Sequence, residues 1–176
     1  MKPNELIVVL IALAVLGASA TSTSAADEGV AVAIVYDTSG SMKELVKDDA
    51  GKFSPKYLIA NRALVAIANR IQTFATNNAA GSPRKIQAGL FVFQKGAAHT
   101  ALPFGPFNAA ALAKWAQNFS APDGGTPLGN ALNTAGHAVL NSGLTRKHVL
   151  VITDGMNTIG PNPDAILPKL QQEAGQ

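Results

Sequence analysis

Residues 30–36 read VAVAIVY, and this uninterrupted apolar run decides the fold. A strand with one solvated face alternates apolar and polar residues, whereas an unbroken apolar run predicts a strand buried on both faces, as in a parallel sheet. The run stops at Asp37, and a second run of the same kind, HVLVIT at residues 148–153, stops at Asp154. If the two strands are parallel, the two carboxylates lie at the same edge of the sheet.

Helical patterns alternate with such runs along the rest of the chain. We expect strands at residues 85–94 and, more weakly, 97–102, and helices at 56–76, 108–119, 126–141 and from 162 onward. Residues 42–53 are polar and predict an exposed loop, Ser54 and Pro55 predict a helix cap and first helical residue, and Pro168 predicts a kink or interruption. This alternation predicts an α/β fold with helices on both faces of the sheet. Binding sites in such sheets form beyond the carboxyl ends of the strands.

The composition fits one globular domain and excludes several classes of protein. The chain has 176 residues, 47% of them hydrophobic, and a formal charge of +3. No basic cluster exceeds two residues, which argues against nucleic-acid binding through phosphate contacts. The absence of cysteine excludes a disulfide scaffold, a thiolate zinc site and a cysteine nucleophile.

The first residues predict an export signal. Residues 6–16 read LIVVLIALAVL, Lys2 precedes them, and small residues follow. Cleavage is expected after Ala20 or Ala26, which divides the chain into a signal peptide and polar spacer (residues 1–26) and a domain (residues 27–176). The alternative is an uncleaved membrane anchor, although the apolar run is shorter than the ~20 residues that a span needs. We therefore expect a periplasmic, cell-surface or secreted protein without a stable membrane span.

The residues after the first apolar run have the chemistry of a cation site. The sequence Asp37-Thr38-Ser39-Gly40-Ser41 presents one carboxylate and hydroxyls at alternate positions. Asp154 adds a second carboxylate and Thr126 another hydroxyl. Oxygen donors of this kind suit a hard cation such as Mg²⁺. Simpler roles remain open, because Thr126 could cap a helix and the aspartates could be turn residues.

Taken together, D-x-S-G-S, G-G-T-P at residues 124–127 and I-T-D-G at residues 152–155 resemble the von Willebrand factor A domain and its metal-ion-dependent adhesion site. The resemblance implies a Rossmann-like, three-layer, mostly parallel sheet. It also implies Mg²⁺, or Mn²⁺ or Ca²⁺, as the bound ion, and a protein partner whose acidic residue completes the coordination. The implied metal site consists of Ser39 and Ser41 as direct ligands, Asp37 and Asp154 as direct or water-mediated ligands, and Thr126.

The resemblance extends from about residue 29 to the end of the chain, where two further strand–helix units of the family are expected and missing. In the family, the strand that ends at I-T-D-G lies between the first strand and the fifth. We therefore expect residues 148–153 to form an exposed apolar edge.

The residues favour a binding protein over an enzyme. Ser39 stands where the phosphatases that use an aspartyl-phosphate carry their second aspartate, and no Walker or G-x-S-x-G motif is present. We expect an exported, non-enzymatic domain for metal-dependent protein binding or adhesion. Two alternatives stay open: a structural or assembly subunit with a passive metal site, and, with less support, a metal-dependent hydrolase or phosphotransferase.

Overall fold

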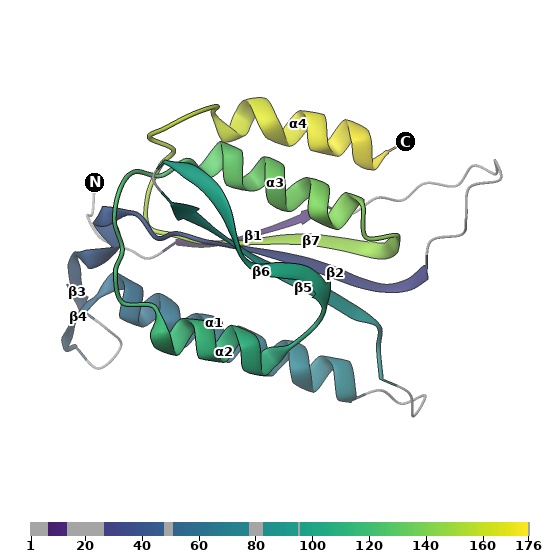
Figure 1. Ribbon diagram of the computed structural model, residues 1–176, viewed down its shortest axis with the longest axis horizontal. Coiled ribbons are helices and arrows are strands. Elements are labelled where there is room, and N and C mark those ends of the chain that lie inside the picture. Colours follow the sequence, from purple (N-terminus) through teal and green to yellow (C-terminus); the bar gives the residue numbers. More distant parts are fainter. Residues whose placement is uncertain (1–6, 14–26, 48–50, 78–82, 95, 176) are drawn as a thin grey trace.

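The computed structural model describes residues 7–13, 27–47, 51–77, 83–94 and 96–175, and it is built around one five-stranded sheet. Helices α1 (Lys56–Thr76) and α2 (Ala109–Asn118) cover one face of this sheet, and α3 (Leu128–Leu140) and α4 (Pro163–Ala174) cover the other (Figure 1). The three-layer α/β fold predicted from the sequence is therefore confirmed. Across the sheet the strands follow the order β1 (Ile7–Leu13), β7 (Leu144–Thr153), β2 (Asp27–Tyr36), β5 (Ile86–Gln94) and β6 (Ala97–Pro106).

Strand β2 is the centre of the sheet and runs parallel to both of its neighbours, β5 and β7. Its alternate side chains supply the two cores of the molecule. Ala33 and Val35 belong to the core under α3 and α4, whereas Ile34 and Tyr36 belong to the core over α1 and α2. All four are completely buried, which explains why residues 30–36 carry no charged side chain.

The outer edge of β7 is covered in the full chain. Strand β1 pairs with it in antiparallel direction over seven positions, from Ile7 opposite Thr153 to Leu13 opposite Lys147. The expectation of an exposed edge at residues 148–153 is thus wrong where residues 7–13 are present, because this apolar segment pairs with the backbone groups of the edge.

The predicted export signal overlaps strand β1. The expected cleavage positions after Ala20 and Ala26 lie outside the described residues, so cleavage stays a prediction. None of the described helices combines the length and the apolar character that a membrane crossing requires.

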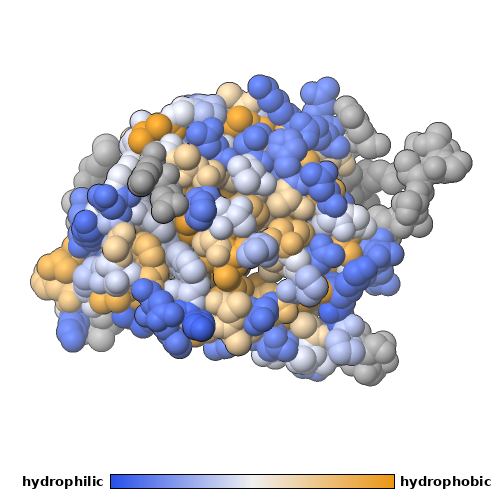
Figure 2. Space-filling view, viewed as in Figure 1, coloured by the Kyte–Doolittle hydropathy of each residue, from blue (hydrophilic) through white to orange (hydrophobic). Residues whose placement is uncertain are grey.

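The segment expected to be an exposed loop contains regular structure instead. A 3₁₀ turn, η1 (Gly40–Lys43), leads into a small antiparallel pair of strands, β3 (Leu45–Lys47) and β4 (Phe53–Pro55). Leu45 and Phe53 are 58% and 61% exposed, and they account for apolar surface at the end of the molecule that carries β3 and β4 (Figure 2).

Two local expectations about the helices are also corrected. Ser54 does not cap α1: Val46 opposes it in the β3–β4 pair, and Pro55 occupies the cap position without a side-chain hydrogen bond. Pro168 lies inside α4 without interrupting it, since Ile166 and Leu170 on either side are anchored in the core. Two helices were expected to begin at residues 108 and 162, and there Asn108 and Asn162 cap α2 and α4, because each side chain accepts a backbone N–H of its helix.

Candidate functional site

The candidate site lies where β2 and β7 end side by side. The parallel register places Tyr36 opposite Ile152, so the residues that follow the two strands leave the sheet at the same edge. The N–H of Asp37 still donates to the carbonyl of Ile152 at 2.8 Å. The prediction that Asp37 and Asp154 share one edge of the sheet is confirmed.

Asp37 is a fully buried carboxylate held by neutral donors. The backbone N–H of Ser39 donates to its Oδ1 at 2.8 Å, and the Thr153 hydroxyl donates to its Oδ2 at 2.6 Å. Burial raises the pKa of the Asp37 carboxyl above its usual range, and these hydrogen bonds only partly oppose that effect. Two hydrogen bonds therefore fix the orientation of the side chain, but the groups that donate them are neutral and do not compensate its negative charge.

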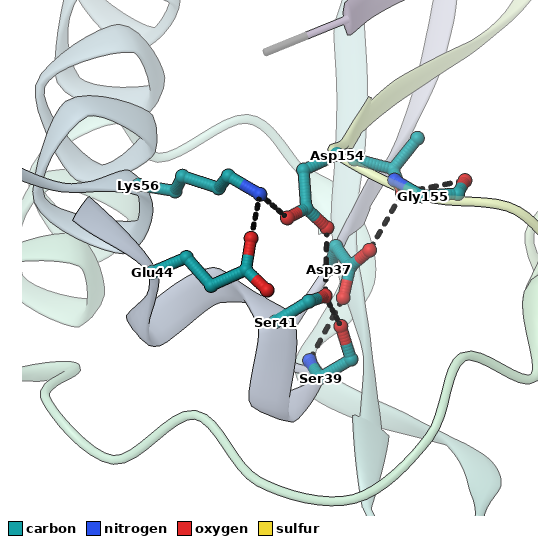
Figure 3. A network of polar contacts seen from close by, with 8 residues as sticks. Asp37, Ser39, Ser41, Glu44, Lys56, Asp154 and Gly155 are labelled. Carbon is teal, nitrogen blue, oxygen red and sulfur yellow. Dashed lines mark hydrogen bonds and ion pairs between the residues drawn. The ribbon is translucent and has the colours of Figure 1, made fainter. Parts of the chain in front are cut away.

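A chain of hydrogen bonds connects Asp37 to Asp154 through the backbone N–H of Ser39 and the hydroxyls of Ser39 and Ser41. The hydroxyls of Ser39 and Ser41 lie 3.0 Å apart, and Ser41 Oγ donates to Asp154 Oδ1 at 2.9 Å (Figure 3). Four of the five predicted site residues are thus brought into one network of polar contacts, although residues 41 and 154 are 113 positions apart.

Lys56 and Glu44 extend this network on the side away from Asp37. The Lys56 ammonium lies 2.6 Å from Asp154 Oδ2 and 2.6 Å from Glu44 Oε2 (Figure 3). The side chains of Lys56 and Asp154 are only 5% and 1% exposed, whereas that of Glu44 is 58% exposed. Desolvation lowers the pKa of Lys56, but its two carboxylate partners outweigh this effect and the net shift is upward.

Thr126 is brought to the same edge by its backbone. Its N–H donates to the Thr158 hydroxyl at 2.8 Å, and its carbonyl accepts the Thr158 N–H at 2.9 Å. The carbonyl of Gly124 accepts the N–H of Gly40 at 2.9 Å, which joins this loop to the loop of the serines. The alternative role of Thr126 as a helix cap is wrong, because α3 begins at Leu128 and Pro127 occupies its cap position.

Comparison with known families identifies the domain that carries this site. A model of the von Willebrand factor type A domain matches residues 32–157, which contain all five predicted site residues. The chain belongs to the von Willebrand factor type A family.

Solved structures support the fold of this von Willebrand factor type A (VWA) domain. An uncharacterized membrane spanning protein from Vibrio fischeri matches with a TM-score of 0.52 and 19% identity, covering 65% of this chain and 51% of its own. The vWF domain of the type V pili tip protein Mfa5 from Porphyromonas gingivalis matches with a TM-score of 0.52 and 20% identity, covering 74% of this chain and 39% of its own. The VWA chain thus spans about half or less of these proteins. No curated protein matches it.

The oxygen donors of the VWA domain fit a hard divalent cation by type. Two carboxylates and the serine hydroxyls lie together, and a ligand set rich in neutral oxygen suits Mg²⁺ or Mn²⁺. Within the described parts of the chain, no three acidic or histidine side chains group in a way that could hold a metal. A metal at this edge would therefore depend on the hydroxyls as well as on the carboxylates.

An open pocket of about 540 Å³ lies beside the network. Thr38 and Gly124 belong both to its wall and to the loops of the site, and its apolar wall includes Trp115 and Phe119, which stack with ring centroids 5.0 Å apart. Both aromatic residues are half-buried, because they pack against the core on one side and face this pocket on the other. The pocket is large enough to accept a side chain of a bound protein.

Sequence patterns do not indicate the role of three residues of the network. They predict only that Lys56 begins a helix, that Glu44 lies in an exposed loop and that Thr153 ends a strand. Glu44 and Lys56 are twelve positions apart and meet because η1 and the β3–β4 pair fold back on the start of α1. The one available signal was the position of Lys56 at the first turn of a helix that starts soon after the serine loop.

Proposed function

We propose that this VWA domain binds one divalent cation, Mg²⁺ or Mn²⁺, and captures a protein partner through it. The ligands proposed are Asp37, Ser39, Ser41, Thr126 and Asp154, directly or through water. When bound, the cation would supply a positive charge at the edge of the sheet, and an acidic side chain of the partner would complete its coordination.

The observation that carries this proposal is the buried Asp37 carboxylate. A buried carboxylate held only by neutral donors is costly unless a cation compensates it. The wider network points the same way, because its three carboxylates and the Lys56 ammonium leave two negative charges when all are ionised. One divalent cation would balance these charges.

The experiment is calorimetric titration of Mg²⁺ or Mn²⁺ into the wild-type protein and into Asp37→Ala. We expect the substitution to abolish metal binding, since it removes one of the two carboxylates proposed as ligands. Asp123→Ala is the matched control, because Asp123 is an exposed acid on a loop at the same edge of the sheet and should leave the affinity unchanged. Equal metal affinity in wild type and Asp37→Ala would refute the site assignment.

Partner binding is tested separately from metal binding. If the cation mediates capture, EDTA should release a bound protein partner and Mg²⁺ should restore the complex. A complex that survives EDTA would favour the second candidate, an assembly subunit with a passive metal site. The covering of β7 by another segment supports that candidate, because it shows that this edge accepts an added strand.

We also propose a cell-surface or extracellular location and a non-enzymatic role. The apolar segment at residues 6–16 and the fold shared with a domain of a pili tip protein support the location. A panel of phosphatase and phosphodiesterase substrates, assayed with Mg²⁺ and Mn²⁺, tests the absence of catalysis.

A further inference from the structure

Lys56 is unusually placed for a lysine, because it lies buried against a proposed metal ligand. It is the first residue of α1, where its backbone N–H donates to the carbonyl of Glu44 at 3.0 Å. Its side chain reaches inward rather than into solvent and is 5% exposed. Lysine is rarely buried to this degree unless it is paired.

The two oxygens of Asp154 are divided between two different groups. Oδ1 accepts the Ser41 hydroxyl at 2.9 Å and so belongs to the proposed metal site. Oδ2 lies 2.6 Å from the Lys56 ammonium. A cation that binds at Asp154 is attracted by the negative charge of that carboxylate. Because the Lys56 ammonium already compensates part of this charge, it weakens the attraction between Asp154 and the cation.

Glu44 gives the Lys56 ammonium a second partner. It contacts the same Nζ at 2.6 Å (Figure 3), and its own side chain is mostly exposed, so Glu44 is the solvent-facing partner of the buried ammonium. An ammonium held by two carboxylates can shift toward one of them without being left buried and unpaired, which would be costly.

We propose that Lys56 is an internal counter-ion of Asp154 that competes with the divalent cation and lowers the metal affinity of the site. In the absence of metal, Lys56 compensates the Asp154 charge. When metal binds, the Asp154 carboxylate interacts with the ion instead of with Lys56, and the Lys56 ammonium stays paired with Glu44. This inference rests on the proposed function and names the residues that regulate the same site.

The first test is Mn²⁺ or Mg²⁺ titration of the full chain carrying Lys56→Met. Methionine keeps the unbranched shape and most of the length of the side chain and removes its charge, so we expect metal affinity to rise about tenfold or more over wild type. Lys43→Met is the matched control, because Lys43 lies only two residues after Ser41 but is exposed. Its removal should change the affinity much less.

The second test uses Glu44→Gln, which removes an exposed carboxylate and is expected to leave the fold intact. Without Glu44, the ammonium is held by Asp154 alone, so metal affinity should fall. A melting experiment in EDTA gives a further readout: Lys56→Met should melt lower than wild type, because Asp154 loses its counter-ion, and saturating Mg²⁺ should remove the difference.

The outcomes separate the two proposals. If the wild type binds metal and Lys56→Met binds it equally or more weakly, the role of Lys56 is overturned and the metal site stands. An unchanged metal affinity in Glu44→Gln would lead to the same conclusion. Absence of metal binding in the wild type and in every variant overturns both. Binding by Lys56→Met alone would show that the ammonium blocks the site completely, which is the strongest form of the proposal.

Discussion

At the scale of single residues, the two aspartates of the candidate site differ in their surroundings. Both side chains are buried at one edge of the sheet, and among the described residues only Asp154 has a cationic side chain beside it. Functional carboxylates of this kind commonly destabilise a protein that lacks its ligand. The two aspartates should therefore respond differently to substitution.

Asp37→Asn should raise the melting temperature of the metal-free protein and abolish its response to Mg²⁺. The amide keeps the size of the side chain and can accept from the Ser39 N–H, but it carries no charge to bury. For a protein of this length, each kcal/mol gained raises the melting temperature by roughly 2–4 °C. Thermal melts in EDTA and in Mg²⁺ measure both effects, and a lower melting temperature in EDTA would contradict the argument.

The same residue predicts a pH dependence. Because the pKa of Asp37 is raised in the folded protein, the folded state keeps this proton to a higher pH than the unfolded chain does. The contribution of Asp37 to stability therefore falls as pH rises above the ordinary value of 3.8 and is lowest once the folded carboxyl ionises. Metal-free wild type compared with Asp37→Asn across acidic pH should show this difference, and parallel pH profiles would contradict it.

At the scale of elements, the approach of α3 to the loop after β7 positions one side of the site. A Cβ built on Gly129 would lie 1.9 Å from the carbonyl oxygen of Pro161, so only glycine fits there without a backbone shift. The N–H of Gly129 also donates to Asn157 at 3.1 Å. This contact holds the loop that carries Asp154 and Thr158 next to Thr126.

Gly129→Ala should destabilise the protein by about 1–3 kcal/mol, as overpacking typically does. It should also weaken metal binding, because the loop of Thr158 must move. Gly105→Ala is the matched control, since a Cβ there meets nothing within 4 Å. Chemical denaturation of both variants measures the effect, and equal stability of the two would show that the loop adjusts at little cost.

The pairing of β1 with β7 predicts the behaviour of the chain without residues 1–26. Removal of β1 leaves the backbone groups of β7 open along an apolar strand, which is a template for association. Residues 27–176 alone should therefore be oligomeric or poorly soluble, whereas the chain with residues 1–26 should associate less and be more soluble. Light scattering coupled to size-exclusion chromatography measures this, and a monodisperse monomer with a cooperative melt would show that the edge closes in another way.

At the scale of the whole molecule, one short segment has two possible roles. Residues 7–13 form an edge strand in the full chain, and they also lie in the apolar stretch predicted to direct export. Cleavage after Ala20 or Ala26 would remove the strand, so the exported domain would need another segment or chain on β7.

Export can be measured directly. Intact-mass analysis of protein released from a bacterial host should give a new N-terminus after Ala20 or Ala26. Protein that still begins at Met1 and stays with the membrane fraction would favour the uncleaved anchor instead.

Local sequence determined the central strands, the helices and four members of the site. Unbroken apolar runs such as residues 30–36 predict strands buried on both faces, because each side chain must enter one of two cores. Two such runs end on aspartate, and the first is followed by two serines, so carboxylate and hydroxyl oxygens lie at one edge. This inference needs only the geometry of parallel strands.

Tertiary structure alone decided which other charges join the site and what covers the sheet. Lys56 and Asp154 are 98 positions apart, and in sequence Lys56 has the pattern of an ordinary solvated helix residue. Its inward direction follows from the β3–β4 pair. The polar composition of residues 42–53 predicts a loop there and gives no sign of these strands. The sequence likewise does not predict the place of β1. Which strands pair depends on the unpaired backbone groups of the whole fold, and an apolar run does not specify which sheet edge it will join.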